Sequence, residues 1–140
     1  MRQGGLFVPA TLTPGVQKLF TDANFGHFAT LMKDGSPQVT TVWLDLDGNR
    51  ILVNTAEGRV KPRNVRRDPR VAISVSDPSG YPSATIRGCV VEVTNEGAEA
   101  HIDKMAKKYL GQDKYPWAQP GDVRLLMVIE PEHIFGMMTD

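Results

Sequence analysis

Six basic side chains lie within the twelve residues from 59 to 70, with one acid, Asp68, among them. They are Arg59, Lys61, Arg63, Arg66, Arg67 and Arg70. A strand-like segment precedes them, and Pro62 is compatible with the first turn of a short helix that Asp68 and the following proline would end. Free amide groups at a helix start, with Arg59, Lys61 and Arg63 beside them, make a site for a phosphate. The stretch therefore predicts an anion site, and a solvated helix face is the alternative.

The chain as a whole is neutral, with 16 basic and 16 acidic residues. This balance argues against a protein that coats nucleic acid with its whole surface. The basic stretch also has little of the aromatic interleaving that single-strand binders use for base stacking. We therefore expect no nucleic-acid partner. A non-enzymatic module that binds RNA or another polyanion through this face is one alternative function.

Elsewhere the sequence offers few groups for chemistry. His27, His101 and His133 are far apart and have no partner at metal-ligand spacing, so we expect no metal site. Cys89 is the only cysteine and lies in an apolar segment, which predicts a buried, unreactive thiol. His27 lies in a strand pattern and is expected in the core or on a sheet face. No phosphate-binding loop, dinucleotide fingerprint or nucleophilic-serine motif is present, so the sequence predicts no catalytic side chain.

These residues need a scaffold, and most of the chain has the pattern of strands between turn signals. Strands are expected over residues 26–32, 38–47, 50–56, 70–77, 83–94, 123–131 and, as an extension, 133–138. The hairpin dipeptides Asp34-Gly35 and Asp47-Gly48 predict that the first three form a meander. Gly88 predicts a bulge or bend in the long strand 83–94.

Two helices are expected besides the short basic one. Thr13 can cap a helix that runs to Phe20, and Gly111 can end an amphipathic helix that begins near residue 95. Strands with hairpin turns and peripheral helices predict a mainly β fold, a small antiparallel barrel, with an open sandwich as the alternative. The length of 140 residues predicts a single domain over residues 1–140. The lone cysteine and the lack of a membrane span or secretion signal predict a cytoplasmic protein without a membrane partner.

Three segments carry a resemblance to a known family: "PQVTTVW", "NTAEGRVKPRNVRRDPRV" and "KYPWAQPGDVRLL". Together they resemble the flavin-binding split β-barrel superfamily that includes pyridoxamine 5′-phosphate oxidase, and most closely its branch that uses the deazaflavin coenzyme F420. The resemblance runs from about residue 12 to residue 135. It implies a six- to seven-stranded antiparallel split β-barrel of the FMN-binding type, which forms a homodimer with a cofactor in each of two grooves at the interface.

The same resemblance implies an activity. The chain would be an oxidoreductase that transfers hydride from reduced coenzyme F420 to a small-molecule acceptor, which the sequence does not identify. The alternative is an FMN-binding oxidoreductase or flavin carrier on the same fold. The oxidase of this superfamily has an uninterrupted Ser-Arg-Lys at its phosphate turn and a Trp/Arg-bearing tail that grips its substrate. This chain has a spread basic turn, residues 57–61, and no such tail, which argues against oxidation of pyridoxamine phosphate.

The resemblance also implies where the cofactor lies. Basic residues after the third strand would hold its phosphate, with polar contacts from that strand, and backbone groups of residues 38–43 would bond the edge of its ring. The late loop that contains Tyr115, Trp117 and Gln119 would reach across from the other subunit. Trp43 has either a core or a groove position, and Arg66, Arg67 and Arg70 bind the cofactor tail or only solvate the helix. The predicted cofactor-binding residues are Gln38, Val39, Thr41, Val42, Trp43, Asn54, Thr55, Arg59, Lys61, Arg63 and Trp117.

Overall fold

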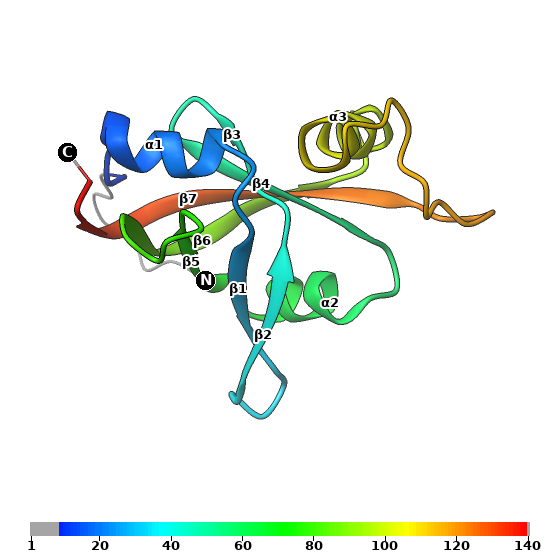
Figure 1. Ribbon diagram of the computed structural model, residues 1–140. Helices are drawn as coiled ribbons and strands as arrows, with labels where there is room; N and C mark the ends of the chain where they lie inside the picture. The colour runs from blue at the N-terminus through cyan, green and yellow to red at the C-terminus, as the bar shows by residue number, and fades with distance from the viewer. Residues whose placement is uncertain (1–8, 140) are drawn as a thin grey trace.

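Seven strands and three helices make up the computed structural model of the chain, which describes residues 9–139 (Figure 1). The strands are β1 (Gly26–Leu31), β2 (Pro37–Val42), β3 (Asp45–Asp47), β4 (Arg50–Ala56), β5 (Arg70–Ser76), β6 (Ser83–Thr94) and β7 (Arg124–Met137). The helices are α1 (Pro14–Thr21), α2 (Val60–Arg67) and α3 (Ala98–Leu110). All strand pairs are antiparallel in one sheet of order β2-β1-β5-β6-β7-β4-β3, which confirms the predicted mainly β, seven-stranded fold and excludes the sandwich of two sheets.

Residues 1–8, whose short apolar patch we interpret as giving no secretion signal, lie outside the described residues, as does residue 140. Between residues 9 and 139, none of the helices is both long enough and apolar enough to cross a membrane.

One predicted strand, residues 38–47, is two strands at opposite edges of the sheet. β2 pairs with β1, whereas β3 pairs with β4, so the predicted three-stranded meander is wrong. The chain crosses between the two edges at Trp43 and Leu44. The N–H of the fully buried Leu44 donates to the Tyr109 hydroxyl of α3 at 2.9 Å and not to a neighbouring strand. A contact from a distant helix has replaced the strand pairing that the local turn signals favour.

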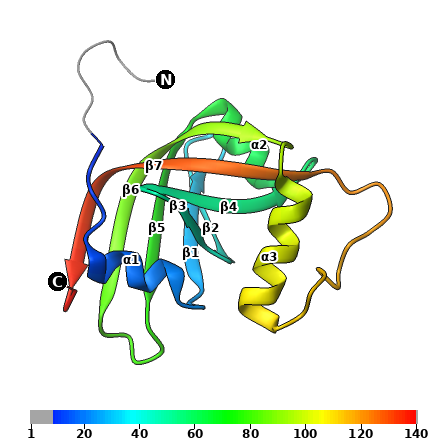
Figure 2. The same ribbon diagram turned by 90° about the horizontal axis from the view of Figure 1, so that it is seen from above.

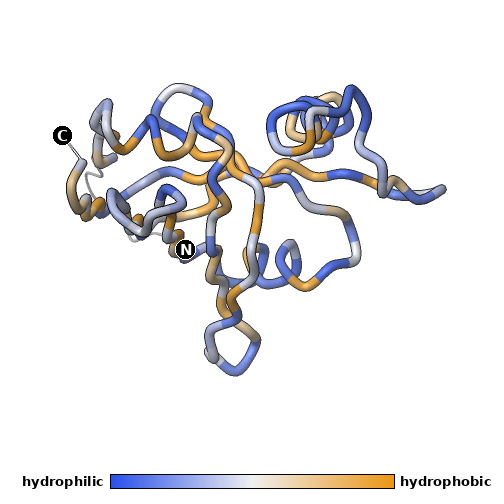
Figure 3. The backbone as a smooth tube through the Cα atoms, in the orientation of Figure 1, coloured by the Kyte–Doolittle hydropathy of each residue, from blue (hydrophilic) through white to orange (hydrophobic). Residues whose placement is uncertain are grey.

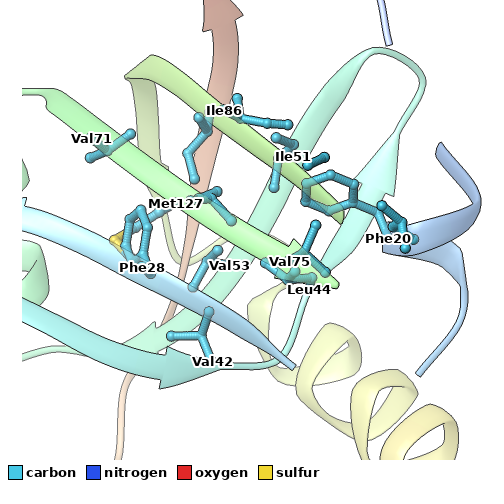
Figure 4. Packing of buried hydrophobic residues seen from close by; sticks show 14 of the residues in the cluster. Phe20, Phe28, Val42, Leu44, Ile51, Val53, Val71, Val75, Ile86 and Met127 are labelled. Carbon is cyan, nitrogen blue, oxygen red and sulfur yellow. The ribbon is translucent and has the colours of Figure 1, made fainter. Parts of the chain in front are cut away.

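The core lies on the inner face of the curled sheet and is closed by α1. Figure 4 shows Phe20 of α1, Phe28 of β1 and Met127 of β7 packed together with Leu44 and Ile51. Each of these five side chains is at most 1% exposed. Colouring by hydropathy shows the same division, with apolar segments along the central strands and polar ones in the loops (Figure 3). The helices α1 and α3 lie towards opposite ends of β7 (Figure 2).

The sequence signals at helix ends are confirmed. Thr13 caps α1 through its hydroxyl, which accepts the N–H of Val16 at 3.4 Å. Gly111 ends α3 in the left-handed conformation, with φ of 72°. The buried face of α3 includes His101, a residue that the amphipathic pattern did not assign to the core.

β6 bends at Gly88, as predicted. Its pairing with β7 shifts register between Arg87 and Gly88 and again between Val90 and Glu92. A Cβ atom on Gly88 would overlap the backbone carbonyl oxygen of Glu130 in β7, so only glycine allows the two strands to approach this closely. β7 itself continues to Met137, which confirms the predicted extension of the sheet except for its last residue, Met138.

We predict that Gly88→Ala lowers the free energy of unfolding by about 1–3 kcal/mol, because the new methyl group must push two paired backbones apart. Urea denaturation monitored by circular dichroism measures the change. Glu92→Ala, at an exposed position of the same strand, is the control and should change stability by less than about 0.5 kcal/mol. Equal effects of the two substitutions would contradict the proposed backbone clash.

Candidate functional site

One open pocket of about 220 Å³ brings most of the predicted cofactor-binding residues together. Eight of them line it: Thr41, Val42, Trp43, Asn54, Thr55, Arg59, Lys61 and Trp117. Gln38, Val39 and Arg63 do not line it; Val39 is 64% exposed on β2. Four further residues complete the lining, namely Phe25, Ile102, Tyr115 and Arg124. That the eight bind a cofactor stays a prediction, but the structure places them around one cavity.

The basic part of the pocket is built by a short local segment. β4 ends at Ala56, and the chain turns through Gly58, whose φ of 88° favours glycine. α2 then begins after Arg59 and ends at Arg67, directly before Asp68, as predicted. The first turn of α2 has no acidic residue, and no side chain caps it. Its amide groups and the adjacent cations are therefore left for an external anion.

The three arginines of the second half of the basic stretch have partners within the chain. Arg66 makes two bonds to the Glu57 carboxylate, at 2.5 and 3.1 Å, and so ties α2 to the preceding turn. Arg67 donates to the carbonyl of Leu31 at 3.2 Å, and Arg70 pairs with Asp68 at 2.7 Å. None of the three lines the pocket. The structure therefore favours a structural role for them over a role in binding a cofactor tail.

Three cations and no carboxylate line the pocket: Arg59, Lys61 and Arg124. Burial lowers the pKa of Lys61, and the neighbouring charge of Arg59 lowers it further. Burial likewise lowers the pKa of Arg124, and the charge of Arg59 lowers it further. The protonated forms of Lys61 and Arg124 are thus disfavoured by lost hydration and by the charge of Arg59, and a bound anion would offset both effects. The charge distribution fits an anionic ligand.

Aromatic rings also line the pocket, and we call Trp43, Tyr115 and Trp117 the aromatic wall. Trp43 stacks on Tyr109 of α3 at 5.2 Å between centroids, with only 5° between the ring planes. Tyr115 meets Trp43 edge-on at 6.1 Å, and Trp117 lies 6.4 Å from Trp43. Trp117 is 57% exposed, so the wall is open to a ligand. Exposed aromatic faces of this kind stack with planar ring systems.

The aromatic wall comes from one chain. Tyr115 and Trp117 pack against Trp43 of their own chain. That this loop also reaches the other subunit stays a prediction. The loop is held back onto α3, because Asp103 accepts the N–H of Tyr115 at 2.9 Å. Of the two positions considered for Trp43, the structure shows the groove position.

Arg124 is the functional candidate that the sequence did not reveal. Arg124 and Asn54 share no local motif, because 70 residues separate them. Even so, Arg124 Nε donates to Asn54 Oδ1 at 2.9 Å. Within the described part of the chain, Arg124 Nη1 and Thr55 Oγ1 are buried polar atoms without a hydrogen-bond partner. Orphaned groups of this kind are rare in native proteins and fit a site that a polar ligand completes. The only sequence signal is a charge at the start of an apolar strand, which is common.

The other side chains considered for chemistry lie elsewhere. Cys89 is buried in β6, as predicted. His27 is on an exposed face of β1, 3.5 Å from the Thr41 hydroxyl. Among residues 9–139, no group of three or more histidine, cysteine or acidic side chains could hold a metal ion.

Comparisons with known proteins agree with this geometry. The sequence profile of the family described as pyridoxamine 5′-phosphate oxidase matches residues 12–138. A solved structure named F420 reductase is 30% identical, covers 85% of this chain and 94% of its own, and superposes with a TM-score of 0.75. A conserved hypothetical protein from Mycobacterium tuberculosis is 20% identical over 98% of this chain and 89% of its own, with a TM-score of 0.71. General Stress Protein 26 from Bacillus anthracis is 14% identical over 88% and 91%, with a TM-score of 0.65. The last two show likeness of fold alone.

We predict that Tyr109→Phe lowers the free energy of unfolding by about 1–3 kcal/mol, since the buried N–H of Leu44 loses its partner. The same hydroxyl donates to the carbonyl of Asn24 at 2.8 Å, so that group loses a bond as well. Urea denaturation measures the change, with Tyr81→Phe as the control because Tyr81 is 60% exposed. A Tyr109→Phe protein as stable as the control would show that the hydroxyl does not hold the strand crossing.

Proposed function

The chain belongs to the pyridoxamine 5′-phosphate oxidase family, and from this premise we propose that it is an oxidoreductase that moves hydride from reduced coenzyme F420 to a small-molecule acceptor. The observation that carries the proposal is a single pocket that combines three cations, no carboxylate and an aromatic wall. A ligand with a planar ring and an anionic tail matches these two surfaces. The 30% identity to a protein named F420 reductase supports the deazaflavin over FMN.

The residues of this chain would bind and orient the cofactor. Arg59 and Lys61, at the start of α2, would hold its phosphate by charge-assisted hydrogen bonds. The aromatic wall would stack against one face of its ring and leave the other face for the acceptor. The cofactor, when bound, supplies the hydride chemistry, which accounts for a pocket without a nucleophile or a pair of carboxylates.

We also propose that the chain forms a homodimer. Val39 of β2 is directly opposite Ala29 of β1, which lines a second, apolar groove together with Leu31 and Ala72. These side chains share one face of the sheet, and an apolar face with an exposed valine fits a second copy of the chain.

We predict that both tryptophan residues report binding, because the sequence has two and both line the pocket. Titration with coenzyme F420 should quench their fluorescence, with much weaker binding of FMN. Lys61→Ala and Arg59→Ala should each weaken the binding free energy of coenzyme F420 by about 1.5–3 kcal/mol, the range for a hydrogen bond to a charged group.

Arg63→Ala is the matched control, because Arg63 is an exposed residue of the same helix that does not line the pocket. Its affinity should equal that of the wild type. Tighter binding of FMN would move the protein to the FMN-binding alternative. Wild-type affinity in both the Lys61→Ala and Arg59→Ala proteins would remove these residues from the phosphate site.

The dimer has its own test. Val39→Glu places a charge on the apolar face of β2 and should shift the mass in sedimentation equilibrium from two chains to one. Lys33→Glu, in the exposed turn between β1 and β2, is the control and should leave the mass unchanged. A wild-type protein that sediments as a single chain would contradict the dimer.

A further inference from the structure

A buried chain of hydrogen bonds leads from the pocket into the space between β3 and α3. Arg124 Nε donates to Asn54 Oδ1 at 2.9 Å, and Asn54 Nδ2 lies 3.1 Å from His101 Nδ1. His101 Nε2 in turn lies 3.0 Å from Asp45 Oδ2. The four residues come from β7, β4, α3 and β3, so the chain joins elements that are distant in sequence.

The groups at the two ends, Asp45 and Arg124, fix the direction of every bond. Burial by itself would raise the pKa of Asp45, but hydrogen bonds from His101 and Lys104 outweigh it and lower the pKa to about 2. The ionised carboxylate can only accept, so His101 Nε2 carries a proton. Arg124 Nε can only donate, so Asn54 turns its oxygen to Arg124 and its Nδ2 to His101 Nδ1, which accepts. Asn54 Nδ2 also donates to the carbonyl of Ala98 at 2.9 Å. The amide oxygen is thereby turned towards Arg124, and each group has one orientation.

This arrangement changes the role expected for Asn54. Both ends of its amide are used within the chain, by Arg124 on one side and by Ala98 and His101 on the other. Asn54 is therefore placed to hold Arg124 and not to contact the ligand through its own amide.

Arg124 itself is incomplete. It is 6% exposed and lines the pocket, and its Nη1 has no hydrogen-bond partner among residues 9–139. Its guanidinium lies over the ring of Tyr115, 5.1 Å from the centroid. Tyr115 belongs to the aromatic wall, so Arg124 reaches the side of the pocket at which a planar ring would stack. A buried guanidinium N–H without a partner is costly, and an oxygen atom of a ligand would remove that cost.

We propose that Arg124 is a ligand-binding residue that donates from Nη1 to a carbonyl oxygen on the edge of the ring stacked against the aromatic wall. Asn54, His101 and Asp45 are positioning residues that hold its guanidinium in place. The inference rests on the proposed function in one respect, since the ligand is a flavin or deazaflavin ring. Arg59 and Lys61 then serve the phosphate, and Arg124 serves the ring.

Pairs of ligands with and without phosphate separate these two roles. The probes are FMN with riboflavin, and coenzyme F420 with its phosphate-free riboside, each titrated by tryptophan quenching. Arg124→Met should weaken both members of a pair by the same factor, about 10- to 100-fold. Lys61→Ala should weaken only the phosphorylated member. Arg124→Lys keeps the charge without the fork of donors and should lose most of the same affinity.

The positioning residues are tested by rescue and by a double-mutant cycle. Asn54→Leu should weaken the binding of riboflavin about tenfold. Asn54→Asp should recover only part of that loss, because it keeps an oxygen for Arg124 Nε but places a second oxygen against the Ala98 carbonyl and His101 Nδ1. In the Arg124→Met background, Asn54→Leu should have no further effect, because the residue that it positions is gone. Lys107→Gln is the control and should leave the affinity for riboflavin unchanged, since Lys107 is exposed on α3 and pairs with Asp113, outside the chain of bonds to Arg124.

The outcomes distinguish this inference from the proposed coenzyme. Wild-type affinity for riboflavin and the riboside in the Arg124 variants, with folding checked by circular dichroism, would overturn the role of Arg124 even where coenzyme F420 binds well. Loss confined to FMN and coenzyme F420 would overturn it too, by making Arg124 a phosphate ligand. Weaker riboflavin binding in a protein that does not bind coenzyme F420 would support Arg124 and reject the coenzyme. A wild-type chain that binds none of the four probes would overturn both.

Discussion

The crossing of the chain at Trp43 and Leu44 is the constraint on which the site depends. Both backbone polar groups of Leu44 bond side chains of α3. Its N–H donates to the Tyr109 hydroxyl, and its carbonyl oxygen accepts a hydrogen bond from Lys108 Nζ at 2.6 Å. These hydrogen bonds stabilise the crossing, so β2 and β3 lie at opposite edges of one sheet although only Trp43 and Leu44 separate them in sequence. It also leaves Trp43 stacked on Tyr109, where it begins the aromatic wall. The strand crossing and the start of the aromatic wall therefore depend on the same contacts with α3.

The parts of the site that were predictable are local in sequence. The strand end at Ala56, the turn at Gly58 and the start of α2 follow from adjacent residues, so Arg59 and Lys61 were found with their surroundings. The crossing was missed because Asp47-Gly48 signals a hairpin equally well for a long strand and for the short β3. Arg124 and the buried His101 were missed because their partners lie on other elements, and no spacing within the sequence encodes them.

The basic stretch divides into two halves with different purposes. In its second half Arg66 pairs with Glu57 and Arg70 pairs with Asp68, while Arg67 donates to the carbonyl of Leu31. In its first half Arg59 and Lys61 line a pocket without acids, so the neutral protein concentrates unbalanced charge at one place. The number of basic residues in the stretch therefore overstates how many of them line the anion site. It also omits Arg124, which lines the site from β7.

The pocket is lined by segments that are far apart along the chain, from Phe25 near the start to Arg124 at the beginning of the last strand. A ligand that contacts all of them can bind only when the sheet has closed and α3 is in place. Binding free energy is then added to folding free energy, by RT ln(1 + [L]/Kd) for a ligand at concentration [L]. The supply of cofactor would thereby set the population of chains that open and become accessible to proteases, and the lifetime of the protein would follow the availability of its ligand.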